Sequence, residues 1–124
     1  MKKVEGYLIN LDITYEEVAD DTWVLHDSEK GLEQVAIAVD DPLVVIRVNV
    51  MQVPEQDREE FYRTLLTLNA SELVHGAYAL EGEEVLLIDT LQYDSMDLND
   101  FQASLDAVSL ALAEHYTTLK KFRT

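Results

Sequence analysis

The sequence of 124 residues contains no cysteine, only two prolines and four glycines, and no long hydrophobic run. Without cysteine, neither a disulfide framework nor a thiolate metal site is possible. The longest uninterrupted apolar run covers residues 35–39, whereas a membrane-spanning helix needs about 20 apolar residues. Polar residues interrupt the apolar stretch at the N-terminus, and it lacks a small-residue cleavage site. We therefore expect neither a membrane span nor a signal peptide.

Basic residues are also scarce. The chain has 9 lysines and arginines against 25 acidic residues, which gives a formal net charge of −16. Such a surface repels phosphate backbones and anionic lipids, so we expect neither nucleic acid nor a membrane as partner. It suits a basic partner, and simple solubility explains it equally well. Because 48% of the residues are hydrophobic, we expect one globular domain over residues 1–124. The missing cysteines fit a reducing compartment, and we expect the protein in the cytoplasm.

The periodicity of apolar residues predicts an α+β fold. We expect three helices and an antiparallel five-stranded sheet, in the order α-β-β-β-α-β-β-α, with the helices over one face or one end. A short first helix is predicted from the helical spacing of Val4, Tyr7, Leu8 and Leu11. Alternating or apolar segments predict the five strands within residues 14–27, 32–41, 43–53, 77–80 and 84–93.

The strand predicted at 43–53 has the clearest alternation in the chain. One of its faces is apolar and is expected to join the core, through Val44, Ile46, Val48 and Val50. The opposite face is mixed and is expected to be partly exposed. Such a face can hold an extended peptide through alternating side-chain pockets, and an open sheet edge can add a strand. The predicted partner-binding residues on it are Val45, Arg47, Asn49 and Met51.

A second helix is predicted to begin at Pro54, whose fixed φ suits the first helical position. It is predicted to end at Asn69, because asparagine can adopt the left-handed conformation that terminates a helix. The helix has more apolar side chains than one sheet face needs, which favours a homodimer interface. The alternative, a helix wedged between the sheet and the last helix, remains open. The predicted interface residues are Phe61, Tyr62, Leu65, Leu66 and Asn69.

The last helix is predicted to be long and amphipathic. Asp97 is a good N-cap, and Met96 and Phe101 match a hydrophobic staple. Apolar residues recur at alternating spacings of three and four and predict one strong seam. That seam comprises Leu98, Phe101, Leu105, Val108, Leu112, His115, Leu119 and Phe122.

Motifs that carry catalysis are missing from the sequence. The three histidines, His26, His75 and His115, match no nucleophile–base pattern. The segment "DSMDLND" superficially resembles a calcium loop but lacks the glycine and the closing glutamate. We therefore expect no catalytic residue, no metal and no cofactor. A carboxylate dyad assembled from distant positions remains open.

Residues 65–80, "LLTLNASELVHGAYAL", can be read as chemistry or as a helix end followed by a turn. With its neighbours, this stretch resembles the type III secretion chaperone-like proteins (the Tir-chaperone class), and especially their YbjN-like bacterial relatives. The resemblance rests on the Leu-Leu-x-Leu-Asn helix end, the small-aromatic strand start and the acidic glycine turn. It rests further on the apolar strand and the capped helix that follow, and on the Val-Pro pair at 53–54.

The resemblance implies that Asn69 stops a helix and that Ser71 and His75 are loop residues. It also implies a small, acidic homodimer that binds an extended segment of another polypeptide and has no catalytic residues. We therefore expect a non-enzymatic, chaperone-like or regulatory protein that binds a partner polypeptide. Two alternatives remain open: a regulator that senses a small ligand, and a small enzyme with a pocket between helix and sheet.

Overall fold

The computed structural model describes residues 2–73 and 75–123. Along the chain, the elements are α1 (Lys2–Asn10), β1 (Tyr15–Ala19), β2 (Thr22–Asp27), η1 (Ser28–Lys30), β3 (Leu32–Asp40), β4 (Leu43–Gln52), α2 (Arg58–Ser71), β5 (Ala77–Glu81), β6 (Glu84–Gln92) and α3 (Leu98–Lys120). The strands form one antiparallel sheet in the order β1-β2-β3-β4-β6-β5. The predicted α+β class with three helices is confirmed.

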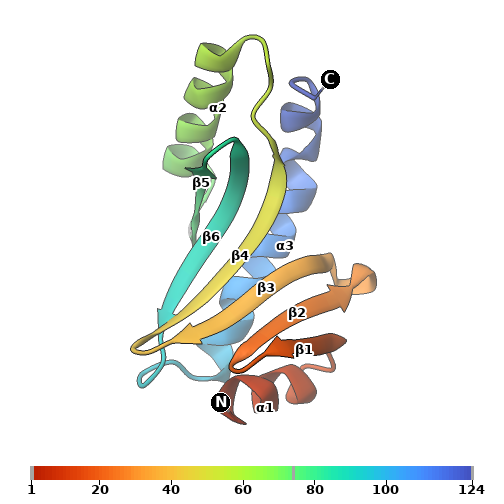
Figure 1. Cartoon of the computed structure of the whole chain (residues 1–124), viewed down its shortest axis with the longest axis vertical. Helices are drawn as coiled ribbons and strands as arrows, with labels where there is room; N and C mark the ends of the chain where they lie inside the picture. The colour runs from red at the N-terminus through yellow and green to blue at the C-terminus, as the bar shows by residue number, and fades with distance from the viewer. Residues whose placement is uncertain (1, 74, 124) are drawn as a thin grey trace.

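The longest helix, α3, passes behind β3 and β4 in Figure 1, and the face of the sheet turned toward the viewer carries none of the described helices. We call the side covered by α3 the inner face and the opposite side the outer face. The inner face forms the core together with the seam of α3 and with α1, through residues such as Leu8, Ile46, Leu87, Phe101 and Leu105.

The predicted cap of the last helix is confirmed, and of the eight predicted seam residues five are buried and three, Leu98, Leu112 and Phe122, are half-buried. The buried residues of α3 are Phe101, Ser104, Leu105, Val108, Ala111, His115 and Leu119. At its start, the Asp97 carboxylate accepts a hydrogen bond from the N–H of Asp100 (2.8 Å), and the Asp100 carboxylate accepts one from the N–H of Asp97 (3.1 Å). This capping box satisfies backbone donors that a helix start leaves without partners.

The sheet has six strands, so the prediction of five is wrong by one. The extra strand comes from residues 14–27, which form the two strands β1 and β2 instead of one. Ala19 pairs with Thr22, so the chain reverses through Asp20 and Asp21 alone. Asp21 adopts a positive φ of 55°, a conformation that aspartate tolerates better than most residues. Because this reversal takes only two residues, the alternation of apolar and polar residues over 14–27 does not by itself reveal it.

A β-bulge corrects the predicted faces of β4. Asn49 pairs with Leu86 of β6, but Met51 pairs with Val85, so one extra residue lies between the two pairs. An extra residue moves all later side chains to the opposite face of the sheet. Val85 is fully buried in the core, and Met51 therefore lies on the inner face. The prediction that Met51 shares a face with Asn49 is wrong.

Both predicted ends of the second helix also differ from the structure. The backbone stays extended through Val53, whose N–H donates to the carbonyl of Glu83 (2.7 Å), and α2 begins at Arg58, four residues after Pro54. At the other end α2 continues to Ser71, so Asn69 does not stop it. The helix continues because Asn69 has another partner for its side chain.

That partner is the outer edge of β5. The Asn69 amide accepts a hydrogen bond from the N–H of Tyr78 (2.7 Å) and donates one to the carbonyl of Tyr78 (3.2 Å). It therefore occupies both backbone groups with which Tyr78 would bond a further strand. Exposed strand edges promote unwanted pairing, and covering them is a common protection. Asn69 thus joins α2 to β5 and blocks the middle of that edge.

We expect Asn69→Ala to lower the free energy of unfolding by about 1–2 kcal/mol, because two partly buried backbone groups lose their partner. Urea unfolding of the purified variant measures the loss. Asn99→Ala is the matched control, since Asn99 is an exposed residue of α3 and the substitution brings the same gain in helix propensity. Equal effects of the two substitutions would contradict the role of Asn69.

Candidate functional site

The outer face of the sheet is lined mainly by small and apolar side chains. Strand pairing puts one row across the sheet from β2 to β5, namely Val24, Ala36, Arg47, Ile88 and Ala77, and on β1 Glu16 pairs with Val24. The rows on either side add further residues of the same kind, Ala38, Val45, Leu86 and Ala79. Short side chains on a face without a helix leave room for another chain to lie against the sheet.

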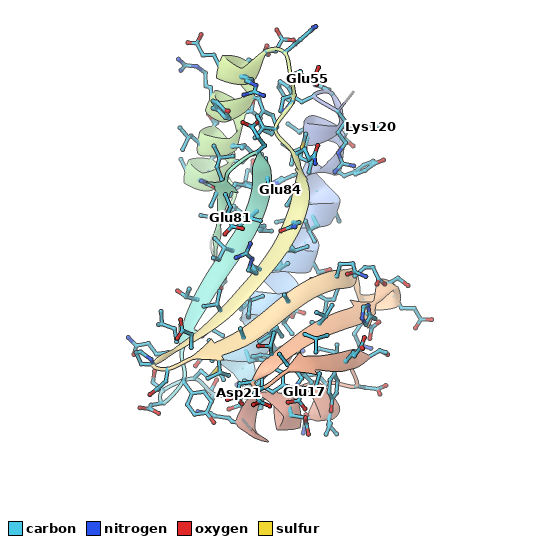
Figure 2. All side chains as sticks on the ribbon, in the orientation of Figure 1. Glu17, Asp21, Glu55, Glu81, Glu84 and Lys120 are labelled. Carbon is cyan, nitrogen blue, oxygen red and sulfur yellow. The ribbon has the colours of Figure 1, made fainter. Side chains whose placement is uncertain are left out.

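The side chain of Arg47 crosses one strand of this face. Its guanidinium nitrogens lie 3.1 and 3.5 Å from the carboxylate oxygens of Glu81, which is labelled in Figure 2 at the end of β5. In the sheet, β6 lies between β4 and β5. The register places Leu86 between Ile88, which pairs with Arg47, and Glu84, which pairs with Glu81. Leu86 is only 4% exposed, although it lies on the face without a helix. We attribute this burial to the side chain of Arg47, which crosses β6 at that point.

A hollow of about 550 Å³ lies beside Arg47, lined by Val24, Gln34, Ala36, Arg47 and Asn49. The strand register places three of the predicted partner-binding residues on the outer face: Val45, Arg47 and Asn49. Met51 does not join them, because the bulge turns it toward the end of α3. There it lines a separate crevice with Phe122.

Sequence reasoning missed the contribution of β6 to this face. Val85 to Ile88 form a run of four apolar residues, and such a run is typical of a strand with apolar side chains on both faces. The sequence therefore indicated that both faces of this strand are apolar, but it does not tell which of the two faces lacks a helix.

A second apolar surface lies between α2 and β5. A groove of about 310 Å³ there is lined by Tyr62, Leu65, Leu66, Asn69, Tyr78, Ala79 and Leu80. Leu66 is 68% exposed and Leu80 is 49% exposed, so both present large apolar side chains to solvent. Contiguous exposed apolar side chains are typical of interaction sites.

Of the five predicted interface residues, Asn69 bonds the backbone of Tyr78, and the other four divide into two groups. Phe61 and Leu65 belong to the core, where the ring of Phe61 contacts that of Phe122 at 5.1 Å between centroids. Tyr62 is half-buried and Leu66 is exposed, so these two remain accessible to a partner. The wedged-helix alternative describes the first group, and the interface prediction applies to the second.

The histidines lie on separate elements. His26, on β2, lies 3.5 Å from Glu16 and 3.3 Å from Glu33 at the surface. His75 is exposed between α2 and β5. His115, buried on α3, is bonded through Nδ1 to the hydroxyl of Tyr78 at 2.7 Å, and burial raises the pKa of Tyr78 to about 12. A phenol with this pKa stays protonated at neutral pH. The absence of a catalytic histidine stays a prediction.

The six-stranded sheet with one helix-covered face and a free outer face agrees with a known family. The family model CesT_Tir_1 matches residues 1–124. The chain belongs to this family, the type III secretion chaperone family. No curated protein sequence matches the chain significantly. Among the described residues, no helix is long and apolar enough to cross a membrane.

Solved structures of this type are similar to the chain in fold. YbjN from E. coli, described as a candidate transcription regulator, has a TM-score of 0.68 at 12% identity, covering 94% of this chain and 91% of that chain. The HopA1–SchA chaperone–effector complex gives 0.67 at 4% identity, covering 91% and 89%. The Yersinia pestis type III secretion chaperone SycH, in complex with a stable fragment of YscM2, gives 0.64 at 14% identity, covering 91% and 96%.

We expect Arg47→Ala to expose Leu86 with little loss of stability. An exposed ion pair contributes at most about 1 kcal/mol, whereas Leu86 would lose its cover. Increased fluorescence of a hydrophobic dye, together with an unfolding free energy that changes by less than about 1 kcal/mol, is the expected result. Lys121→Ala, at an exposed position just after α3, is the control and should leave dye binding unchanged. If both variants bind dye like the wild type, Arg47 does not cover Leu86.

Proposed function

We propose that this protein is a non-enzymatic, chaperone-like protein of the cytoplasm that works as a homodimer and holds a segment of another polypeptide. Membership of the secretion chaperone family supports a role in binding a protein partner. Two of the similar solved structures are described as complexes of a chaperone with another protein, which supports the same reading. The observation that carries the proposal is the uncovered outer face with its small apolar side chains.

An extended segment fits the outer face for two reasons. The alanines of β3 and β5 leave space between the longer side chains of Val24, Arg47 and Ile88, so a bound segment can insert alternate side chains. The net charge of −16 favours a basic segment and speeds its association at low salt.

Strand addition offers a second contact for the same segment. Asn69 occupies the edge-facing backbone groups of Tyr78, which hinders the pairing of a further strand along β5. At the other edge of the sheet, β1 is exposed at every residue after Tyr15. We therefore infer that a bound segment adds to the sheet along β1 and not along β5.

The homodimer is proposed to form through α2 and β5. Leu66 and Leu80 are exposed on adjoining elements, with Tyr62 between them and the core. Burying such side chains against a second copy stabilises association, and two-fold symmetry would pair the same surface with itself. Phe61 and Leu65 would hold α2 in place from the core side.

We expect light scattering to give a mass near twice 14.1 kDa for the wild type and near 14.1 kDa for Leu66→Asp. A buried aspartate in a dimer interface is not tolerated without a partner. Leu110→Asp is the matched control, because Leu110 is an exposed leucine of α3, away from α2, and this variant should remain dimeric. A monomeric wild type, or a dimeric Leu66→Asp variant, would refute the proposed interface.

We expect a tagged chain to capture a polypeptide from cells of its native organism and not nucleic acid. The captured protein is then titrated with the wild type and with the double variant Ala36→Lys, Val45→Lys. Lysines at these two half-buried positions fill the space between the side chains of the outer face and add two positive charges that repel a basic segment, so affinity should fall at least about tenfold, about 1.4 kcal/mol. Leu110→Lys should bind like the wild type.

Circular dichroism of the double variant confirms that it is folded before the titration is interpreted. Capture of nucleic acid without protein would refute the proposed polypeptide binding. Equal affinity of the double variant and the wild type would show that the segment does not bind on the outer face.

A further inference from the structure

Three metal-ligating side chains come together where the end of α2 lies near α3. One ring nitrogen of His115 and one carboxylate oxygen each from Glu72 and Glu114 lie within 4.8 Å of one another. Glu72 directly follows α2, and the other two are consecutive residues of α3. Three atoms with this spacing have a common centre at most about 2.8 Å from each. Zn²⁺ binds such ligands at about 2.0–2.2 Å, so small movements of the two exposed carboxylates bring all three atoms to bonding distance and leave the fourth position to water.

His115 is the fixed member of this cluster. It is 5% exposed, and its Nδ1 is held by the hydroxyl of Tyr78 at 2.7 Å. Its other ring nitrogen, Nε2, has no hydrogen-bond partner among the described residues. A metal-ligating histidine usually bonds a protein group through its second nitrogen, which fixes the ring and its tautomer. The contact with Tyr78 allows this arrangement, because its hydroxyl oxygen can accept the Nδ1–H and leave Nε2 for an ion.

The two carboxylates lack a compensating cation. Neither Glu72 nor Glu114 forms an ion pair or a side-chain hydrogen bond with any other residue that the structure describes. Two carboxylates at this separation repel each other, and the net charge of −16 adds to the repulsion. A bound cation would offset this repulsion between the two carboxylates.

We propose that Glu72, Glu114 and His115 bind a divalent transition-metal ion, and that Zn²⁺ fits the site best. One imidazole and two carboxylates suit a borderline ion, whereas Mg²⁺ and Ca²⁺ prefer oxygen ligands alone. The ion would tie the end of α2 to α3, beside the β5 residue that orients His115. Its binding does not depend on the proposed function, because none of the three ligands lies on the outer face or lines the groove between α2 and β5.

Calorimetric titration of the chelator-treated, full-length protein with ZnCl₂ at 0.15 M salt tests the site. The expected result is one Zn²⁺ per chain, with an affinity at least about tenfold lower in Glu72→Gln and in Glu114→Gln. Tyr78→Phe keeps the buried ring but removes the hydroxyl, and we expect about tenfold weaker binding from it. Because replacing buried His115 can unfold the chain, its part is tested in the wild type by NMR. Zn²⁺ should shift the imidazole resonances of His115.

The matched control is His26→Gln, which removes a half-buried histidine at the surface that also lies between two glutamates. It should bind Zn²⁺ with wild-type affinity. Equal affinity in all the variants would mean that the ion binds the acidic surface diffusely, and would overturn the site. The proposal also fails if the wild type binds no Zn²⁺, if Mg²⁺ binds equally well, or if the His115 resonances do not move.

Discussion

The packing of one face of α3 against the inner face of the sheet is the constraint on which the rest of the structure depends. The seam of this 23-residue helix is buried along its length. The other two α-helices also pack beside this seam. The ring centroids of Tyr7 in α1 and Phe101 in α3 are 5.4 Å apart, and the ring of Phe61 in α2 contacts that of Phe122, just beyond the end of α3. Two polar contacts fix α3 further, Ser104 to Asp89 (2.6 Å) and His115 to Tyr78 (2.7 Å).

One-sided packing also explains where binding surfaces are available. A single layer of helices covers only the inner face, so the outer face of the sheet must be stabilised without a helix. Alanines and the crossing side chain of Arg47 limit the apolar area that this face exposes. The same arrangement turns Leu66 of α2 away from the core, because Phe61 and Leu65 occupy the inward positions of the helix. The proposed peptide-binding and dimer surfaces thus both result from the packing of the helices on one face of the sheet only.

The proposed metal site has the same origin. Glu72 and His115 are 43 positions apart in the sequence and meet only because α2 and α3 both pack beside β5. No sequence motif connects Glu72 with His115, and the position of His115 on the apolar seam of a helix is typical of an ordinary core residue. The same holds for the cover over Leu86, since the partners Arg47 and Glu81 are separated by two turns and a helix.

The sequence by itself determined the α+β class, the three helices, the seam of α3 and the Asp97 cap, because periodicity and capping depend on residues close in the chain. It also determined that Val45, Arg47 and Asn49 alternate with the buried residues of β4. The tertiary structure decided the sixth strand, the face of Met51 and the true ends of α2. The sixth strand becomes visible only through the pairing of β1 with β2 around the reversal at Asp20 and Asp21. For Met51 and α2, a hydrogen bond or strand register between distant segments overrode the local preference: β6 sets the bulge beside Met51, Glu83 keeps Val53 extended, and Tyr78 takes the side chain of Asn69.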